Sequence, residues 1–158
     1  MPKQVIIGDM LAGVDKGIIV HGCNAVGVMG SGIAKLIKDK WPEVFMSYAR
    51  HCMDIEHRID RLGTVDFVQV SDNLYIANAI TQEIYAGYQG QRHSGPYVSY
   101  DAVSRCFNKI GKFAKDHGLM VNYPLIGAGL AQGNWDIISE RIDKALPDDV
   151  FHVLWKLP

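Results

Sequence analysis

Several features that mark other classes of protein are scarce or missing in this sequence. It has only three cysteines, Cys23, Cys52 and Cys106, with no C-x-x-C pair, which predicts a reducing compartment and no zinc site. Sixteen basic and seventeen acidic residues leave a formal charge of −1, so we expect no nucleic-acid or anionic-membrane surface spread over the fold. No apolar run approaches the roughly 18 residues of a membrane span, and no signal peptide follows Met1. Together these absences predict a cytoplasmic protein.

Length and apolar content limit how the chain is organised. With 158 residues, 48% of them hydrophobic, the chain can bury one core and is too short for two ordinary domains. No internal repeat or low-complexity tract interrupts it. We therefore expect a single domain over residues 1–158.

Short apolar runs alternate with segments of helical periodicity. Strands are expected at residues 4–7, 17–22, 64–70, 74–79, 119–125 and 150–155. Helices are expected at residues 30–40, from Pro42, from about Val103 to Gly118, and from Trp135 to Ala145. Residues 54–61 are typical of a solvated connection, and residues 81–97 of a surface loop flanking a site. The alternation predicts an α/β layered fold with a mixed, largely parallel sheet.

Residues 21–34 run from a strand end through a glycine loop into a helix. Gly27, Gly30 and Gly32 let the backbone approach a ligand closely, and the helix start leaves N–H groups unpaired. This arrangement is typical of an anion site, most often a phosphate site. No Gly-Lys-Ser/Thr closes the loop as in a P-loop. The glycine order and the helical position of Glu43 also exclude a Rossmann-type dinucleotide motif.

A second strand, glycine loop and helix follow at residues 119–145, with the glycines in residues 127–133. Both units place unpaired N–H groups at strand ends, where open α/β sheets bind ligands. Two such loops that converge suit a ligand with two or more phosphates. Asp9, directly after the first strand, either accepts a hydrogen bond from a ligand or forms a turn with nearby backbone N–H groups.

Three motifs resemble the signatures of a macro domain: Gly8-Asp9-Met10, residues 21–34 with their Val-Met-Gly-Ser-Gly-Ile-Ala core, and residues 124–135. The resemblance runs in order over nearly the whole chain. It is strongest for the branch that contains ADP-ribose 1''-phosphate phosphatases and terminal ADP-ribose glycohydrolases. It implies a three-layer α/β/α macro domain that binds ADP-ribose with no metal and no further cofactor.

The same resemblance implies roles for individual residues. Asp9 accepts a hydrogen bond from the adenine amino group, Met10 lines the same pocket, and Asn24 faces the distal ribose. The two glycine loops enclose the diphosphate and the distal ribose, mostly with backbone N–H groups. The first loop contributes Val28, Met29, Gly30, Ser31, Gly32 and Ile33, and the second contributes Gly127, Ala128, Gly129, Leu130 and Ala131. Trp135 is assigned to the core rather than to the ligand.

The residues expected to carry catalysis depart from part of this branch. Its glycohydrolases use a Lys that forms a covalent sugar adduct and an assisting Asp, where this chain has Gln82 and Ala131. Its phosphatases carry a His ahead of Cys-Asn, and His21 matches that spacing. Beside a phosphate held by backbone N–H groups, His21 serves as the base or as the acid for the leaving oxygen. The alternative is a structural strand-end His bonded to backbone. Asp136, early in a helix, complements the helix dipole.

Three functions remain open from the sequence. The first is a phosphatase that removes the phosphate of ADP-ribose 1''-phosphate, with His21 and Asn24 as catalytic residues. The second is a non-catalytic ADP-ribose reader, and the third is a de-ADP-ribosylating hydrolase that works through substrate and bound water. In each case the partner is a small molecule, ADP-ribose or ADP-ribose 1''-phosphate, with no nucleic acid and no membrane. The sequence does not indicate an oligomeric state.

Overall fold

Six strands form one sheet at the centre of the computed structural model, which describes residues 1–91 and 93–158. The strands are β1 (Gln4–Ile7), β2 (Gly17–Asn24), β3 (Val65–Ser71), β4 (Leu74–Gln82), β5 (Val121–Tyr123) and β6 (His152–Lys156). Their order across the sheet is β1-β6-β5-β2-β4-β3. All neighbours are parallel except β3, which pairs antiparallel with β4. The expected mixed, largely parallel sheet is confirmed.

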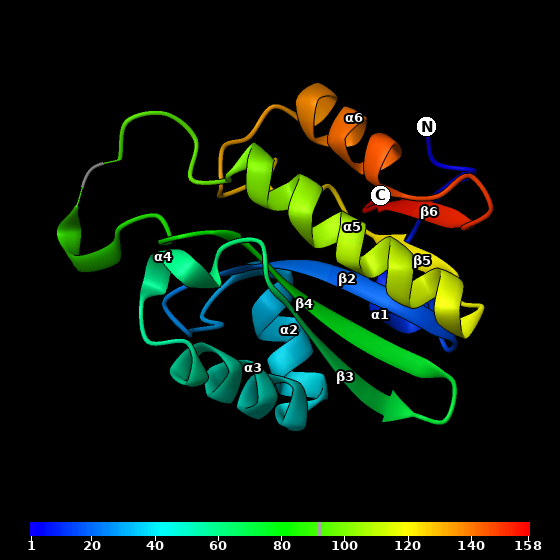
Figure 1. Ribbon diagram of the computed structural model, residues 1–158, viewed down its shortest axis with the longest axis horizontal. Coiled ribbons are helices and arrows are strands. Elements are labelled where there is room, and N and C mark those ends of the chain that lie inside the picture. Colours follow the sequence, from blue (N-terminus) through cyan, green and yellow to red (C-terminus); the bar gives the residue numbers. More distant parts are fainter. Residues whose placement is uncertain (92) are drawn as a thin grey trace.

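Helices cover both faces of the sheet (Figure 1). One face carries α5 (Tyr100–His117) and α6 (Trp135–Ala145), and the other carries α1 (Met10–Gly13), α2 (Gly32–Lys40) and α3 (Pro42–Asp54). α4 (Arg58–Arg61) follows α3, and a 3-10 turn, η1 (Tyr88–Gly90), lies between β4 and α5. The three-layer α/β/α arrangement is thus confirmed. No helix in residues 1–91 and 93–158 is both long and apolar enough to cross a membrane.

β2 is the central strand of the core and is buried on both faces. Ile18 and Val20 pack with the α5 and α6 layer, and Ile19 packs with the α1, α2 and α3 layer. A strand buried on both sides is a nearly continuous apolar run. Its sequence therefore predicts a strand without showing which side chain faces which layer.

The ends of α5 follow from its sequence. The Ser99 side chain accepts a hydrogen bond from the N–H of Ala102, and Gly118 adopts the left-handed conformation after the last turn. A hydroxyl at the first position satisfies a free helix N–H, and glycine tolerates the positive φ at the last.

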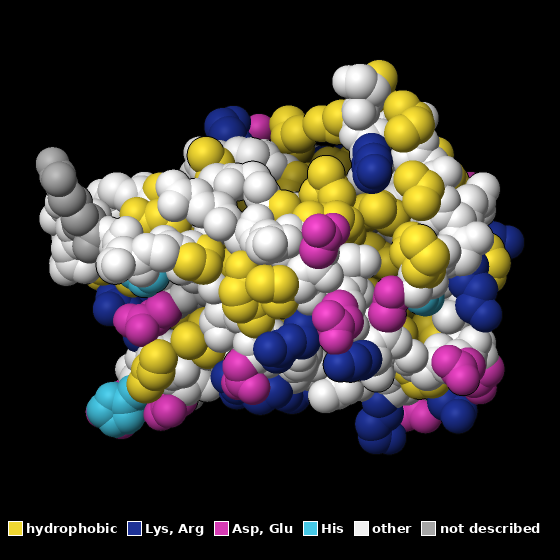
Figure 2. Space-filling view, turned by 90° about the horizontal axis from the view of Figure 1, so that it is seen from above, with side chains coloured by type: hydrophobic (Ala, Val, Ile, Leu, Met, Phe, Trp, Pro, Cys, Tyr) yellow, Lys and Arg dark blue, Asp and Glu magenta, His cyan; other side chains and the backbone are white. Residues whose placement is uncertain are grey.

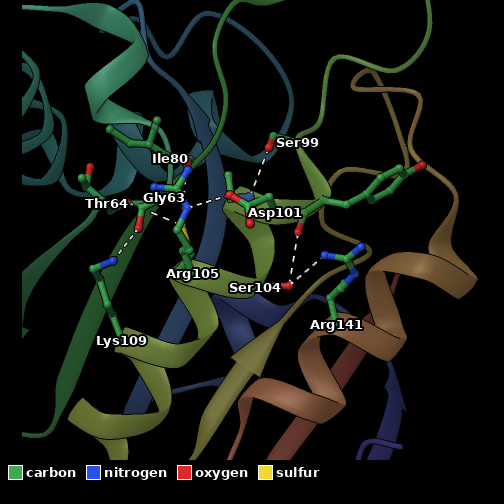
Figure 3. A network of polar contacts seen from close by, with 12 residues as sticks. Gly63, Thr64, Ile80, Ser99, Asp101, Ser104, Arg105, Lys109 and Arg141 are labelled. Carbon is green, nitrogen blue, oxygen red and sulfur yellow. Dashed lines mark hydrogen bonds and ion pairs between the residues drawn. The ribbon is translucent and has the colours of Figure 1, made fainter.

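Polar contacts fasten α5 to the turn before β3 and to α6 (Figure 3). The Lys109 ammonium donates to the Gly63 carbonyl oxygen at 3.0 Å. Gly63 has a φ of +80°, which favours glycine, and a Cβ there would come 2.5 Å from Cζ of Arg105, so that side chain would have to move. Within the same layer, Arg141 of α6 donates to the Ser104 hydroxyl of α5 at 3.3 Å. These contacts fix α5 relative to both of its neighbours.

Two short helices and several element ends differ from the prediction. α1 and α4 have four residues each, too few for a periodic signal, and α4 occupies the stretch expected to be a solvated connection. β2 continues to Asn24 and β4 to Gln82. α2 begins at Gly32 instead of Gly30, because Ser31 is still extended with φ −153° and ψ 167°. The longer strands carry Asn24 and Gln82 to the edge of the sheet.

Candidate functional site

The strands β1, β6, β5, β2 and β4 run in the same direction and therefore end at one edge of the sheet. Three segments follow these ends (Figure 1): residues 25–31 after β2 (loop 1), residues 124–134 after β5 (loop 2) and residues 83–98 after β4 (the arm). Asp9 follows β1. We call loop 1, loop 2, the start of α2 and Asp9 the strand-end site. It contains both glycine loops expected from the sequence, at the edge where open α/β sheets bind ligands.

The Asn24 side chain organises loop 1. Its Oδ1 accepts hydrogen bonds from the N–H groups of Val26 and Gly27, both at 3.1 Å, and its Nδ2 donates to the Val28 carbonyl oxygen at 3.0 Å. The Tyr48 hydroxyl of α3 donates to the Asn24 carbonyl oxygen at 2.5 Å and accepts from the Gly27 N–H at 3.2 Å. The structure thus gives Asn24 a role inside the loop. Its contact with a ribose remains a prediction.

Three of the predicted loop glycines face open space. A Cβ built on Gly30, Gly32 or Gly129 meets no atom of the described residues within 4 Å. At the start of α2, the cap residue Ser31 makes no side-chain hydrogen bond to its own, fully described helix. α6 differs, because the Asn134 side chain accepts from its first turn. The helix start that can hold an anion is therefore that of α2.

Close backbone contacts shape loop 2. The Gly133 N–H donates to the Gly127 carbonyl oxygen at 2.7 Å, and a Cβ on Gly133 would come 2.5 Å from the same oxygen. Gly127 has a φ of +75°, so both positions require glycine. The Ala131 carbonyl oxygen accepts from the Tyr97 N–H at 2.8 Å. This bond ties loop 2 to the end of the arm.

Three of the predicted ligand-binding residues have side chains that are buried beneath the site. Met10 is 4% exposed, Met29 is 2% exposed and Ala131 is 6% exposed. Met10, the first residue of α1, packs into the core on the α2 and α3 side, and Met29 packs with Tyr48 under loop 1. Burial removes their apolar surface from water. These side chains support the site from below, so a ligand contact of Met29 or Ala131 would come from the backbone, as expected from the sequence, and the ligand contacts of all three residues remain predictions.

His21 lies inside the core, beneath the surface of the strand-end site. Its ring is fully buried, and its Nε2 lies 2.6 Å from Oδ1 of Asn78 on β4. Asn78 also donates to the Val44 carbonyl oxygen of α3 at 3.3 Å, so the ring faces the α3 layer. Burial lowers the pKa of His21 to about 4, and the Asn78 hydrogen bond opposes this only in part. Of the two roles expected from the sequence, the position favours the structural one, with a side chain in place of backbone as the partner.

A polar network extends from His21 on both sides. Cys23 Sγ lies 3.5 Å from His21 Nε2, and Asn78 donates to Asp66 Oδ2 at 3.3 Å. The same carboxylate oxygen accepts from the Ser47 hydroxyl at 2.8 Å. Burial raises the pKa of the Cys23 thiol well above its ordinary value, which makes it a poor nucleophile. The network therefore joins β2, β3, β4 and α3 beneath loop 1 without supplying a reactive group.

Two further predicted positions lie at strand ends. The exposed carboxylate of Asp9 accepts from the Leu11 N–H at 3.0 Å and caps α1, which is the turn-forming role expected as one alternative. Its contact with adenine remains a prediction. The Gln82 amide donates to the Ile84 carbonyl oxygen at 3.0 Å and so belongs to the first residues of the arm.

Two arginines that the sequence did not single out border the site. Arg61 of α4 donates to the Ala25 carbonyl oxygen of loop 1 at 2.7 Å, and Arg58 pairs with Glu83 of the arm at 2.9 Å. Their stretch is charged and has no helical periodicity, so nothing in the sequence links it to the loops. Among the side chains that the structure describes, no group of three or more His, Cys, Asp or Glu could hold a metal ion.

Glycine loops at parallel strand ends, beside a free helix start, define an α/β domain built to bind an anionic ligand. The family model "Macro domain" matches residues 20–142. The chain therefore belongs to the Macro domain family.

Relatives with two different names are similar to this chain. An "ADP-ribose 1''-phosphate phosphatase" of Candida albicans is 27% identical over 84% of this chain and 86% of that protein. A phosphatase of the same name from Neosartorya fischeri is 42% identical over 32% of this chain and only 25% of that protein. A "DNA ADP-ribosyl glycohydrolase" of Mycobacterium tuberculosis is 37% identical over 89% of this chain and 38% of that protein. The chain thus spans well under two thirds of the last two relatives.

Solved structures show the same fold. A protein of unknown function from Bacteroides thetaiotaomicron has a TM-score of 0.83 with 32% identity, covering 97% of this chain and 96% of that chain. A macrodomain protein from Streptomyces coelicolor has a TM-score of 0.77 with 26% identity, covering 96% of this chain and 97% of that chain.

Proposed function

We propose that this protein binds ADP-ribose at the strand-end site. The observation that carries the proposal is the free start of α2 beside Gly30, Gly32 and Gly129, where the backbone faces open space. Backbone N–H groups at such a position suit a diphosphate, because several donors converge on one anion without side-chain charge. Asp9, at the end of β1, supplies an acceptor for the adenine amino group, and loop 2 closes the ribose side.

A second function, removal of the phosphate from ADP-ribose 1''-phosphate, is supported by the relatives that carry this name. The terminal phosphate would be held by N–H groups of loop 1 and of α2, which neutralise charge as water attacks. The buried ring of His21, hydrogen-bonded to Asn78, argues against His21 as the base in this arrangement. Hydrolysis would then depend on the backbone of loop 1.

Release of ADP-ribose from a modified macromolecule is the third function, and it agrees less well with the residues. The M. tuberculosis relative is named a glycohydrolase, but Gln82 has no amine that could form an imine with a sugar. Ala131 is nearly buried and offers no acid or base. We therefore rank this function below the other two.

The test begins with a calorimetric titration of ADP-ribose into the purified protein, with AMP and inorganic phosphate as comparison ligands. Saturable binding of ADP-ribose that exceeds both comparisons supports the proposal, and no binding contradicts it. The protein is then incubated separately with ADP-ribose 1''-phosphate, an ADP-ribosylated protein and ADP-ribosylated DNA. Phosphate release from the first alone supports the phosphatase. Release of ADP-ribose from either macromolecule would overturn the ranking.

A further inference from the structure

α4 lies between loop 1 and the arm, and one of its arginines bonds to loop 1. Arg61 donates through Nη1 to the Ala25 carbonyl oxygen at 2.7 Å and through Nε to the Ile55 carbonyl oxygen at 2.9 Å. Ala25 is the first residue of loop 1. Arg61 therefore ties the beginning of that loop to the segment that leads into α4.

The other arginine of α4 bonds to the arm. Nε and Nη2 of Arg58 lie 3.0 and 2.9 Å from Oε2 of Glu83, and Nη1 donates to the Tyr88 hydroxyl at 3.1 Å. The guanidinium carbon also lies 5.2 Å from the centre of the Tyr88 ring, within cation–π range. The side chains of the ion pair are 36% and 37% exposed, so their charges are partly screened by solvent. The planar fork, which reaches two partners at once, fixes the geometry.

The backbone connects the two arginine contacts. The Ala25 N–H lies 2.9 Å from the Gln82 carbonyl oxygen and 3.1 Å from that of Glu83. Ala25 therefore accepts from Arg61 and donates to the segment whose carboxylate binds Arg58. Each of the three segments, loop 1, the arm and α4, is therefore bonded to the other two.

The other end of the arm is bound to loop 2. The Tyr97 N–H donates to the Ala131 carbonyl oxygen at 2.8 Å, and Gln82 forms an antiparallel bridge with Val98. The arm therefore leaves the fold between loop 1 and loop 2 and projects beyond the sheet (Figure 1). Figure 2 shows this face of the molecule, with the described residues of the arm continuous with the body.

We propose that Arg58 and Arg61 are positioning residues that couple loop 1 to the arm, so that a ligand held by loop 1 also fixes the arm. The ligand in this statement rests on the proposed function, whereas the coupling is a property of the unliganded chain. The two arginines share one helical turn, so a displacement at either contact is passed to the other by a short rigid element.

Amide hydrogen exchange on the unliganded protein tests the coupling. The reporting amides are Val26 and Gly27 in loop 1, bonded to Asn24, and Tyr88 and Gln91 in the arm, each bonded to a backbone carbonyl. One lost hydrogen bond to a charged group corresponds to about a tenfold change or more in local opening. We expect Arg61→Ala to speed exchange about tenfold in loop 1 and severalfold in the arm. Arg58→Ala should speed exchange about tenfold in the arm and severalfold in loop 1.

Arg141→Ala is the matched control, because Arg141 donates to Ser104 between α5 and α6 and has no hydrogen bond to the described residues of loop 1 or the arm. It should leave both sets of amides unchanged. Thermal melts of all three variants check that the fold is intact. If each α4 variant speeds exchange only in the segment that it touches, the coupling is wrong.

Two conservative variants separate geometry from charge. Arg58→Lys keeps the charge opposite Glu83 but cannot reach Tyr88 with the same group, so the arm should recover only part of its protection. Tyr88→Phe should likewise show partial protection of the arm, since it loses only the hydroxyl that accepts from Arg58. Full protection in Arg58→Lys would show that charge alone holds the arm and would overturn the proposed role of the fork.

Repeating the exchange with saturating ADP-ribose connects the coupling to the ligand. In the wild type we expect slower exchange in loop 1 and in the arm, and in Arg58→Ala slower exchange in loop 1 only. Equal protection of the arm in both proteins would contradict the coupling. If ADP-ribose protects neither segment of the wild type, the proposed function fails, and the coupling is decided by the unliganded measurements.

Discussion

The neutral ring of His21 makes the stability of the protein depend on pH. Its pKa is lowered from 6.5 to about 4 by burial, so between these values the unfolded chain binds a proton that the folded chain does not. The free energy of unfolding therefore rises with pH through this window and falls as the pH drops from 6.5 toward 4. From neutral pH to pH 5 we expect a loss of about 2 kcal/mol from this group.

Urea unfolding at pH 7 and pH 5, on the wild type and on His21→Gln, measures this contribution. The variant should be less stable at pH 7 and should lose less stability on acidification. Burial also lowers the pKa of His152, so part of the pH dependence should remain in the variant. An equal loss in the two proteins would mean that His21 is not the group that titrates.

Asp9 combines a structural contact with a predicted ligand contact, and substitutions can separate them. Asp9→Ala removes both the α1 cap and the carboxylate, whereas Asp9→Ser retains a side chain that caps. We expect both variants to lose about 1–3 kcal/mol of ADP-ribose binding free energy, the scale for a hydrogen bond to a charged group. Calorimetry gives the affinity, and a melt shows that Asp9→Ser is folded. Wild-type affinity in Asp9→Ser would remove Asp9 from the adenine site.

At the scale of elements, loop 1 and the end of α5 use glycine for different reasons. Gly30 has no positive φ, and a Cβ there meets no described atom within 4 Å, so Gly30→Ala should leave stability unchanged. The added methyl group should occupy ligand space and cost about 1–3 kcal/mol in ADP-ribose binding.

Gly118→Ala is the complementary control, because Gly118 has a φ of +65° at the end of α5 and precedes β5, whereas loop 2 follows the other end of that strand. It should lower stability by about 1 kcal/mol and leave ADP-ribose affinity intact. Thermal melts give the stability of both variants, and calorimetry gives their affinity for ADP-ribose. Loss of stability in Gly30→Ala, or unchanged affinity, would contradict an open loop 1.

How well an element can be predicted depends on the length of its signal. α5 and α6 carry apolar stripes over three turns or more, and β3 and β4 alternate around a tight turn, so their sequences identify them. α1 and α4 have four residues each and carry no periodic signal. They matter at the strand-end site, because α1 follows Asp9 and α4 carries Arg58 and Arg61.

The facing of side chains on β2 could not be predicted for a different reason. Residues 17–24 are buried on nearly every position of both faces, so no alternation of polarity shows which way His21 points. Its spacing to Asn24 suggests a site, but its partner Asn78 is 57 residues away in sequence. Likewise, Met29 lies in a loop whose sequence suggests exposure, and only the packing against Tyr48 shows its burial.

At the scale of the whole molecule, the parallel sheet determines which groups can act on a ligand. Parallel strands deliver loop 1, loop 2 and Asp9 to one edge, while the titratable residues of the network around His21 remain in the layer beneath it. Chemistry at this edge must therefore rely mostly on backbone donors. Such donors bind and polarise a phosphate, but they do not transfer protons.

Phosphate release from ADP-ribose 1''-phosphate under single-turnover conditions tests whether catalysis depends on the backbone donors at the edge and not on the titratable residues beneath them. A positioned acid or base is typically worth about 10²–10⁴-fold in rate, so a catalytic His21 would show a loss of that size in His21→Gln. We expect the folded His21→Gln protein to keep its rate within about tenfold of the wild type, because the ring is buried and hydrogen-bonded to Asn78. Gly30→Ala should lose the activity, because its methyl group displaces the phosphate from loop 1.

A loss of 10²-fold or more in His21→Gln, with ADP-ribose affinity intact, would return His21 to the active site. If the wild type binds ADP-ribose but releases no phosphate above the uncatalysed rate, the protein is an ADP-ribose reader.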